Sequence, residues 1–299
     1  MKTGKKGNDP ENPPPGLVFV GIERIAHVSG AETEEIERPF ADRSDFLYTG
    51  QLISNEKMAV YSLAVRPQTS IAIPLEAPSY ARIGPAIALQ LLQDLPDVRL
   101  VERLLIIDGR HREEPWIWQT TGQKHVVRAE ALPWGEIRLY RPAADQELGD
   151  VMRHEWCHLL RFASAREASL FDGVGALEPL EADALLGGTA GAWTIPADEI
   201  WATFGEILLT AGAVMAMTAF AYPVRAALWG SALAARLASL PPAMRSGRHD
   251  SYAGSARWLV TTVRERALDE LEKKAEACAD ANAGPGAAAL LAELRREGA

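Results

Sequence analysis

The pentapeptide His154-Glu155-Trp156-Cys157-His158 constrains the fold of this chain more than any other feature. It reads H-E-x-x-H and lies within residues 148–162, where apolar residues recur with helical spacing. Residues four apart share one face of a helix, so both imidazoles can reach a single ion. The chain is therefore expected to form a helix here with one face on a core.

The two faces of this expected helix differ in chemistry. Its apolar stripe consists of Leu148, Met152, Trp156, Leu159, Leu160 and Ala163. Its opposite face carries Asp150, His154, His158 and Arg161. We expect the apolar stripe to face a core and the histidine face to face a cleft. The alternative is a helix with two solvated histidines and a charged neighbour.

Two histidines and a glutamate in this spacing suit a zinc site. Zinc accepts imidazole nitrogen, and a catalytic zinc has three protein ligands and one open position. Glu155 lies next to the histidine face, where it could act as general base on a metal-activated water. The pattern predicts Zn²⁺ as the cofactor, with His154 and His158 as ligands.

With this motif the chain resembles the zincin metallopeptidases. The resemblance implies zinc-dependent hydrolysis of peptide bonds and a zincin-like α+β fold. That fold has a mixed sheet, a backing helix and the motif helix, followed here by a mostly α-helical C-terminal half. Arg161 and Ser164 exclude the branch that has glycine and histidine at those positions. Gly191 stands where another branch has an aspartate, which leaves the gluzincins.

The gluzincin branch takes its third ligand from a glutamate on a later helix. Glu199 and Ala202 form an E-x-x-A start that resembles this helix, in which the small residue lets two helices approach. We therefore predict Glu199 as the third ligand; an exposed first-turn carboxylate is the ordinary alternative. Glu206 is the runner-up ligand, or an acceptor for a ligand histidine. Glu178 and Glu181 are weaker candidates.

The resemblance also implies a donor that stabilises the oxyanion of the tetrahedral intermediate. Residues 245–254 are expected to form a loop between two helices, and they carry Tyr252 and His249 as the first and second candidates. Tyr252 resembles a tyrosine at the start of a glycine-containing helix in some gluzincin aminopeptidases. Tyr222 is a third candidate. Each of these residues could equally be an ordinary interhelical residue.

Sequence patterns divide the chain into three parts. These are a polar tail expected to be disordered (1–16), an N-terminal α/β part (17–145) and a part with the motif helix, the glutamate helix and further helices (146–299). Expected strands are residues 17–25, 58–65, 70–75, 101–108 and 136–140. A helix is expected over 81–95, a hairpin over 116–129, and C-terminal helices over 225–240 and 251–283. Residues 30–55 are polar and are expected to be irregular.

Residues 136–140 alternate polar and apolar side chains, which predicts a half-exposed strand. In zincins the strand beside the cleft pairs with an extended peptide. This strand, or the preceding hairpin strand, could pair with the substrate peptide in this way. The alternative is a plain edge strand protected by its charges.

Composition limits the partners. The net charge of −9, without a basic stripe, argues against nucleic acid. Two cysteines, Cys157 and Cys278, exclude a disulfide framework and favour a reducing, cytoplasmic setting. Cys157 is expected to be packed rather than ligating. The uncharged residues 207–224 read as a buried helix rather than a membrane span.

The sequence thus predicts an intracellular zinc metallopeptidase acting on a peptide or protein, with no membrane partner and its oligomeric state open. Two rival hypotheses remain: a non-catalytic metal-binding or regulatory module that keeps the fold, and a membrane-embedded metalloprotease. The intact Glu155 argues against the first rival, because a non-catalytic site needs no base there.

Overall fold

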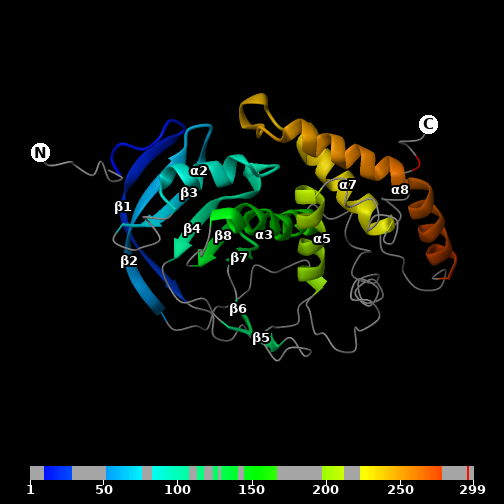
Figure 1. The fold of residues 1–299 in the computed structure, drawn as a ribbon, viewed down its shortest axis with the longest axis horizontal. Coiled ribbons are helices and arrows are strands. Elements are labelled where there is room, and N and C mark those ends of the chain that lie inside the picture. Colours follow the sequence, from blue (N-terminus) through cyan, green and yellow to red (C-terminus); the bar gives the residue numbers. More distant parts are fainter. Residues whose placement is uncertain are drawn as a thin grey trace, which may run out of the picture. The chain divides into compact units, whose positions relative to one another are not determined.

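The structure is a computed structural model of the 299-residue chain. It describes residues 10–28, 52–75, 83–107, 113–117, 124–126, 129–140, 145–166, 197–211, 223–277 and 295. The described residues form an α+β protein with a mixed sheet, as predicted (Figure 1). The chain divides into two compact units, Met1–Ile117 with Lys124–Trp156, and Trp118–Gln123 with Cys157–Ala299. The helix that carries the motif contributes residues to both units.

The first unit is built on a six-stranded sheet in the order β1-β2-β3-β4-β8-β7. Its strands are β1 (Leu17–Val28), β2 (Leu52–Leu63), β3 (Arg66–Pro74), β4 (Arg103–Ile107), β7 (Ala129–Leu132) and β8 (Glu136–Tyr140). β3, β4 and β8 run parallel, whereas β1, β2 and β3 pair antiparallel, as do β7 and β8. The five strands expected from the sequence are all present. β2 begins at Leu52, so the last part of the segment expected to be irregular is strand.

A separate two-stranded sheet pairs β5 (Glu113–Ile117) with β6 (Lys124–Val126) in antiparallel fashion. This pairing confirms the expected hairpin, and its turn lies outside the described residues.

β8 is an interior strand, which corrects the half-exposed strand expected over 136–140. It pairs with β4 on one side and β7 on the other, and Ile137 and Leu139 are fully buried. The polar alternation has another cause. Arg138 Nε donates to Glu136 Oε1 at 2.6 Å and Arg138 Nη1 lies 3.1 Å from Glu130 Oε1, so these charges pair with each other. Among the described strands, β7 is the one at this edge of the sheet.

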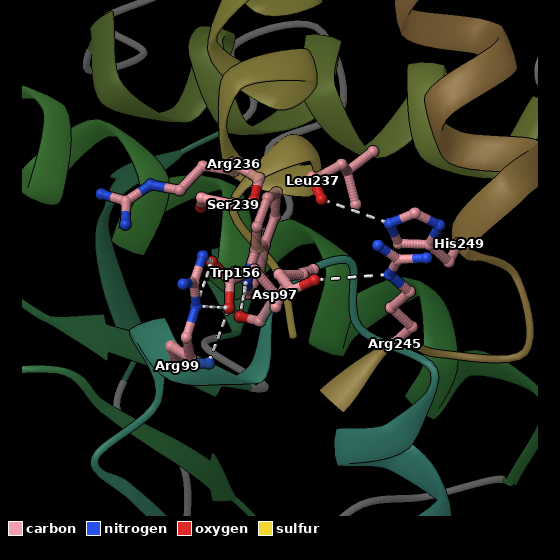
Figure 2. Close-up of polar contacts among 9 residues, drawn as sticks. Asp97, Arg99, Trp156, Arg236, Leu237, Ser239, Arg245 and His249 are labelled. Carbon is pink, nitrogen blue, oxygen red and sulfur yellow. Dashed lines mark hydrogen bonds and ion pairs between the residues drawn. The ribbon is translucent and has the colours of Figure 1, made fainter. Parts of the chain in front are cut away.

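Two elements flank the sheet before the motif helix: α2 (Pro85–Gln93) and the short 3-10 helix η2 (Val98–Leu100). α2 confirms the helix expected over 81–95 with shorter bounds, and Pro85 occupies its first turn. The motif helix, α3 (Asp145–Arg166), is anchored in this unit by Trp156. The Trp156 Nε1–H donates to the Asp97 carbonyl at 2.8 Å (Figure 2). The Asp97 carboxylate in turn accepts from Arg99, which fixes the start of η2.

The second unit contains the last turns of α3 together with α5 (Ala197–Ala211), α7 (Pro223–Ala238), the 3-10 helix η6 (Pro242–Met244) and α8 (His249–Ala277). α7 and α8 confirm the two expected C-terminal helices, with different starts. Pro223 is the first residue of α7, a position at which proline is tolerated in a helix.

α8 begins at His249, so the expected loop over 245–254 is wrong in its second half. No helix within the described ranges is both long and apolar enough to cross a bilayer. That finding leaves out most of residues 207–224, because 212–222 are outside the description.

Candidate metal centre

The motif lies in the middle of α3, an uninterrupted helix of 22 residues. The predicted apolar stripe is buried along the helix at Leu148, Met152, Trp156, Leu159 and Leu160. This packing fixes the rotation of the helix, and His154 and His158 therefore share a face, one turn apart. The helix, its stripe and the relation between the two histidines are as the sequence predicts.

The motif side chains are more enclosed than an open cleft would leave them. Glu155 and His158 are each 6% exposed and Arg161 is 7% exposed, whereas His154 is half-buried. The His158 ring stacks with Phe162, with ring centroids 6.3 Å apart. The alternative of two solvated histidines is therefore wrong for His158. Burying ionisable groups costs free energy, and such burial is concentrated at functional sites.

α5 contacts α3 at Gly205. A Cβ built on Gly205 would lie 2.6 Å from Cys157 Sγ and 2.5 Å from Trp229 Cζ2 of α7. Only a glycine leaves room for both neighbours, so this position sets the spacing of α3, α5 and α7. Cys157 is fully buried in this contact, which confirms that it is packed. It immediately precedes His158, so α5 passes beside the motif.

Of the two candidate carboxylates on α5, the structure describes the side chain of one. Glu199 is in the first turn of α5, but its side chain lies outside the described part. Glu206 is half-buried, and Ala202, the expected point of close approach, is fully buried. Among the side chains that are described, no three His, Cys, Asp or Glu are grouped so as to hold a metal ion. Glu206 belongs to that described set and Glu199 does not; Glu178 and Glu181 are also outside it.

The two proposed oxyanion donors are in the first turn of α8, not in a loop. His249 Nε2 lies 3.3 Å from the Leu237 carbonyl (Figure 2). Its Nδ1 lies 3.2 Å from Asp250 Oδ1. Arg245 Nε donates to the neighbouring Leu240 carbonyl at 3.3 Å. These contacts supplement the Leu240 N–H, which donates to the Leu237 carbonyl at 3.2 Å, at the end of α7, where the last carbonyls have no donor within the helix. His249 thus has a structural task that its position in the sequence did not reveal.

Tyr252 is buried and packs under Arg248, whose guanidinium carbon is 5.0 Å from the ring centroid. Arg248 Nη2 also donates to the Leu209 carbonyl at 3.3 Å, so this pair joins the start of α8 to the end of α5. Tyr222, the third candidate donor, lies outside the described residues.

Sequence reasoning missed Gly205 as the point of contact with the motif helix. A signal was present, because glycine inside a helix costs about 1 kcal/mol relative to alanine and often marks a packing requirement. The glycine points to the approach of two helices, but only the structure shows that Cys157 and Trp229 are the neighbours.

No protein-family description, curated protein or solved structure matches this chain.

Proposed function

We propose that this chain is a zinc-dependent metallopeptidase of gluzincin type, with His154, His158 and Glu199 as ligands and Glu155 as general base. The observation that carries the proposal is the burial of Glu155 and His158, each 6% exposed, within an H-E-x-x-H motif on a continuous helix. A solvated surface helix would not keep these polar groups from water.

The position of α5 supports the same proposal. Its glycine contact with Cys157 brings α5 alongside the residue that precedes His158. α5 carries Glu199 and Glu206, so a carboxylate from this helix is a reasonable third ligand. The element order also agrees with the resemblance, since a buried strand, a hairpin, β8, the motif helix and the glutamate helix follow one another.

The donor set fits zinc in its chemistry, because two imidazole nitrogens and one carboxylate oxygen are common ligands of catalytic zinc. When bound, zinc would supply Lewis acidity toward a water and a peptide carbonyl. Glu155 would take up the proton from the attacking water and deliver it to the leaving amine. Its buried position strengthens this role, since electrostatic interactions increase away from bulk water.

We assign no oxyanion role to His249, because both of its ring nitrogens face oxygen atoms at the junction of α7 and α8. Tyr252 stays a candidate donor. The substrate class is a peptide or protein. A cytoplasmic setting without nucleic-acid or membrane partners is part of the proposal, and it rests on the charge of −9 and the cysteine count.

The test combines metal analysis with a peptidase assay on the purified full chain. We expect about one zinc per chain and cleavage of a mixed peptide library, detected by mass spectrometry. Glu155→Gln should keep the zinc and lower the rate by about 10²- to 10⁴-fold, because glutamine cannot accept the proton. Glu265→Gln, an exposed change on α8, is the matched control and should behave as wild type.

Two outcomes would redirect the assignment. A protein without bound zinc after expression in zinc-supplemented medium would remove the metal centre. Zinc that is held by the histidines without cleavage of any peptide would favour the non-catalytic module instead.

A further inference from the structure

Trp156 lies inside the motif, two residues after His154 and two residues before His158. At about 100° per residue, its side chain leaves α3 on nearly the opposite side from both histidines. The side chain is fully buried, and its indole contacts the segment before β4 in the first unit. Trp156 therefore joins the motif to the rest of that unit.

The contact of the indole is a hydrogen bond with a defined direction. Trp156 Nε1–H donates to the Asp97 carbonyl at 2.8 Å, and both residues are fully buried. The apolar stripe at Met152 and Leu160 holds α3 against its core, but apolar burial is non-directional and tolerates a small rotation of the helix. A hydrogen bond weakens as its angle departs from linear. The indole bond thus fixes the rotation of α3 about its own axis.

The acceptor of this bond is itself held in place. The Asp97 carboxylate accepts from the Arg99 backbone N–H at 2.9 Å, from Arg99 Nε at 2.9 Å and from Arg99 Nη2 at 2.8 Å. The Asp97 carbonyl also accepts a longer bond, at 3.4 Å, from the Leu100 N–H. Figure 2 shows Arg99, Asp97 and Trp156 as one chain of contacts, which we call the indole clamp.

The far end of η2 is tied to the sheet by a similar bond. Thr69 of β3 is fully buried, and its Oγ1–H donates to the Val101 carbonyl at 2.6 Å. Two buried side-chain donors thus hold the backbone carbonyls on either side of η2. Trp156 is the donor that belongs to the motif helix, whereas Thr69 belongs to the sheet.

A small rotation of α3 would displace the proposed catalytic groups by a distance that matters. With the Cα atoms about 2.3 Å from the helix axis, a glutamate carboxylate is roughly 6 Å from it, so a rotation of about 10° moves the group by about 1 Å. A misplacement of about 1 Å can cost on the order of 10²-fold in rate. The proposed ligand set takes two nitrogens from α3 and one oxygen from α5, so it depends on the same rotation.

We propose that Trp156 is a positioning residue of the proposed peptidase, and that the indole clamp sets the rotation of α3 at which Glu155 and the two histidines work. This inference deepens the proposed function and rests on it. The clamp acts through the motif residues and does not touch the substrate. Its loss should therefore lower kcat and alter metal binding while KM changes little.

The test compares Trp156→Phe with Thr69→Val in the zinc-loaded full chain. Each substitution removes one buried donor from a backbone carbonyl beside η2, so we expect similar losses in the urea concentration at the unfolding midpoint. Trp156→Phe should also lower kcat about 10- to 100-fold, with KM within about threefold of wild type. Thr69→Val should keep the kcat of the parent chain.

Metal binding gives a readout that does not depend on turnover. In a chelator competition, Trp156→Phe should hold zinc about 10- to 100-fold more weakly, as expected when a group that orients the ligands is lost. The visible absorption of the Co²⁺-loaded chain, which reports ligand geometry, should shift in Trp156→Phe and stay unchanged in Thr69→Val.

Arg99→Gln tests whether the effect passes through Asp97. It frees the Asp97 carboxylate, so it should lower kcat and zinc affinity in the same direction as Trp156→Phe, and by less. The double variant should lose no more than Trp156→Phe alone, because both substitutions act on one carbonyl. If Trp156→Phe does not fold, Arg99→Gln decides, and parent-like kcat and zinc affinity in that variant overturn the proposal.

Three results overturn the inference in a parent chain that binds zinc and cleaves peptide. They are unchanged kcat and Co²⁺ absorption in folded Trp156→Phe, equal losses of kcat in Trp156→Phe and Thr69→Val, and additive losses in the double variant. In each case the proposed peptidase stands and the clamp falls. A parent chain without zinc or cleavage is a failure of the proposed function, and the positioning role falls with it.

Discussion

α3 and the start of α8 both place a histidine next to a carboxylate, but the surrounding helices use them differently. In α3, His154, Glu155 and His158 are in the interior of a helix whose backbone groups satisfy each other. In α8, His249 is the first residue, and its Nε2 contacts the Leu237 carbonyl near the end of α7, beside the Leu240 N–H that also donates to this oxygen. A histidine inside a helix can thus serve a ligand, whereas one at a helix end is often needed by the backbone.

The largest expected difference between the histidines of α3 and the histidine of α8 is in zinc binding. His154→Ala and His158→Ala should each lose the metal, because removing one of three ligands leaves too few donors. His249→Ala should retain it, since this ring contacts Leu237 and Asp250. Zinc per chain is measured by atomic emission after gel filtration. Retention of zinc in both α3 variants would end the metal hypothesis.

A second prediction separates the two carboxylates of α5. Glu199→Ala should give up zinc to a mild chelator, whereas Glu206→Ala should bind it only about 10- to 100-fold more weakly, as expected for an outer acceptor. The residues are about 10 Å apart along the helix, so both cannot ligate one ion held by the two histidines. The measurement is a chelator competition titration. The reverse order would assign the third ligand to Glu206, and wild-type affinity in both would exclude α5 as its source.

The spacing of apolar residues was sufficient to predict α3, α5 and five of the six strands of the sheet, because these residues repeat every 3.6 or 2 positions along the chain. β7 was not predicted as a separate strand. The spacing also failed at β8, where Glu136 and Arg138 alternate with apolar residues as on an exposed strand. The structure buries these two charges by pairing them with each other and with neighbours on β4 and β7. A pattern of single residues does not contain such cross-strand partners.

The candidate site likewise has residues that the sequence pattern predicts and residues that it does not. The histidines and Glu155 could be predicted because a local spacing defines them. Gly205, Cys157 and Trp229 meet only through the packing of three helices, which no local pattern shows. The start of α8 was misplaced because the contacts of His249 and Arg245 with the end of α7 lie beyond the reach of helical period.

A third prediction tests whether the Gly205 contact holds the motif helix. Gly205→Ala should lower the free energy of unfolding by about 1–3 kcal/mol, because the new methyl group overpacks against Cys157 and the rigid indole of Trp229. Gly254→Ala on α8 is the control, since a Cβ there meets nothing within 4 Å. That change should stabilise the protein by about 0.5–1 kcal/mol. Urea denaturation measures both, and an equal gain from the two substitutions would contradict the close packing.

The smallest effect is expected for His249 at the start of α8. His249→Ala should lower the free energy of unfolding by about 0.5–1.5 kcal/mol, the usual contribution of one hydrogen bond, because the Leu237 carbonyl keeps the Leu240 N–H but loses its contact with the imidazole. Glu265→Gln is the control, since Glu265 is an exposed residue of the same helix that does not contact His249. We expect the control to unfold at the same urea concentration as wild type. Peptidase activity and zinc content should be unchanged in both variants, since His249 contacts α7 rather than the motif. A loss of activity in folded His249→Ala, with zinc retained, would return this histidine to the site and show that a helix-capping residue can also serve the substrate.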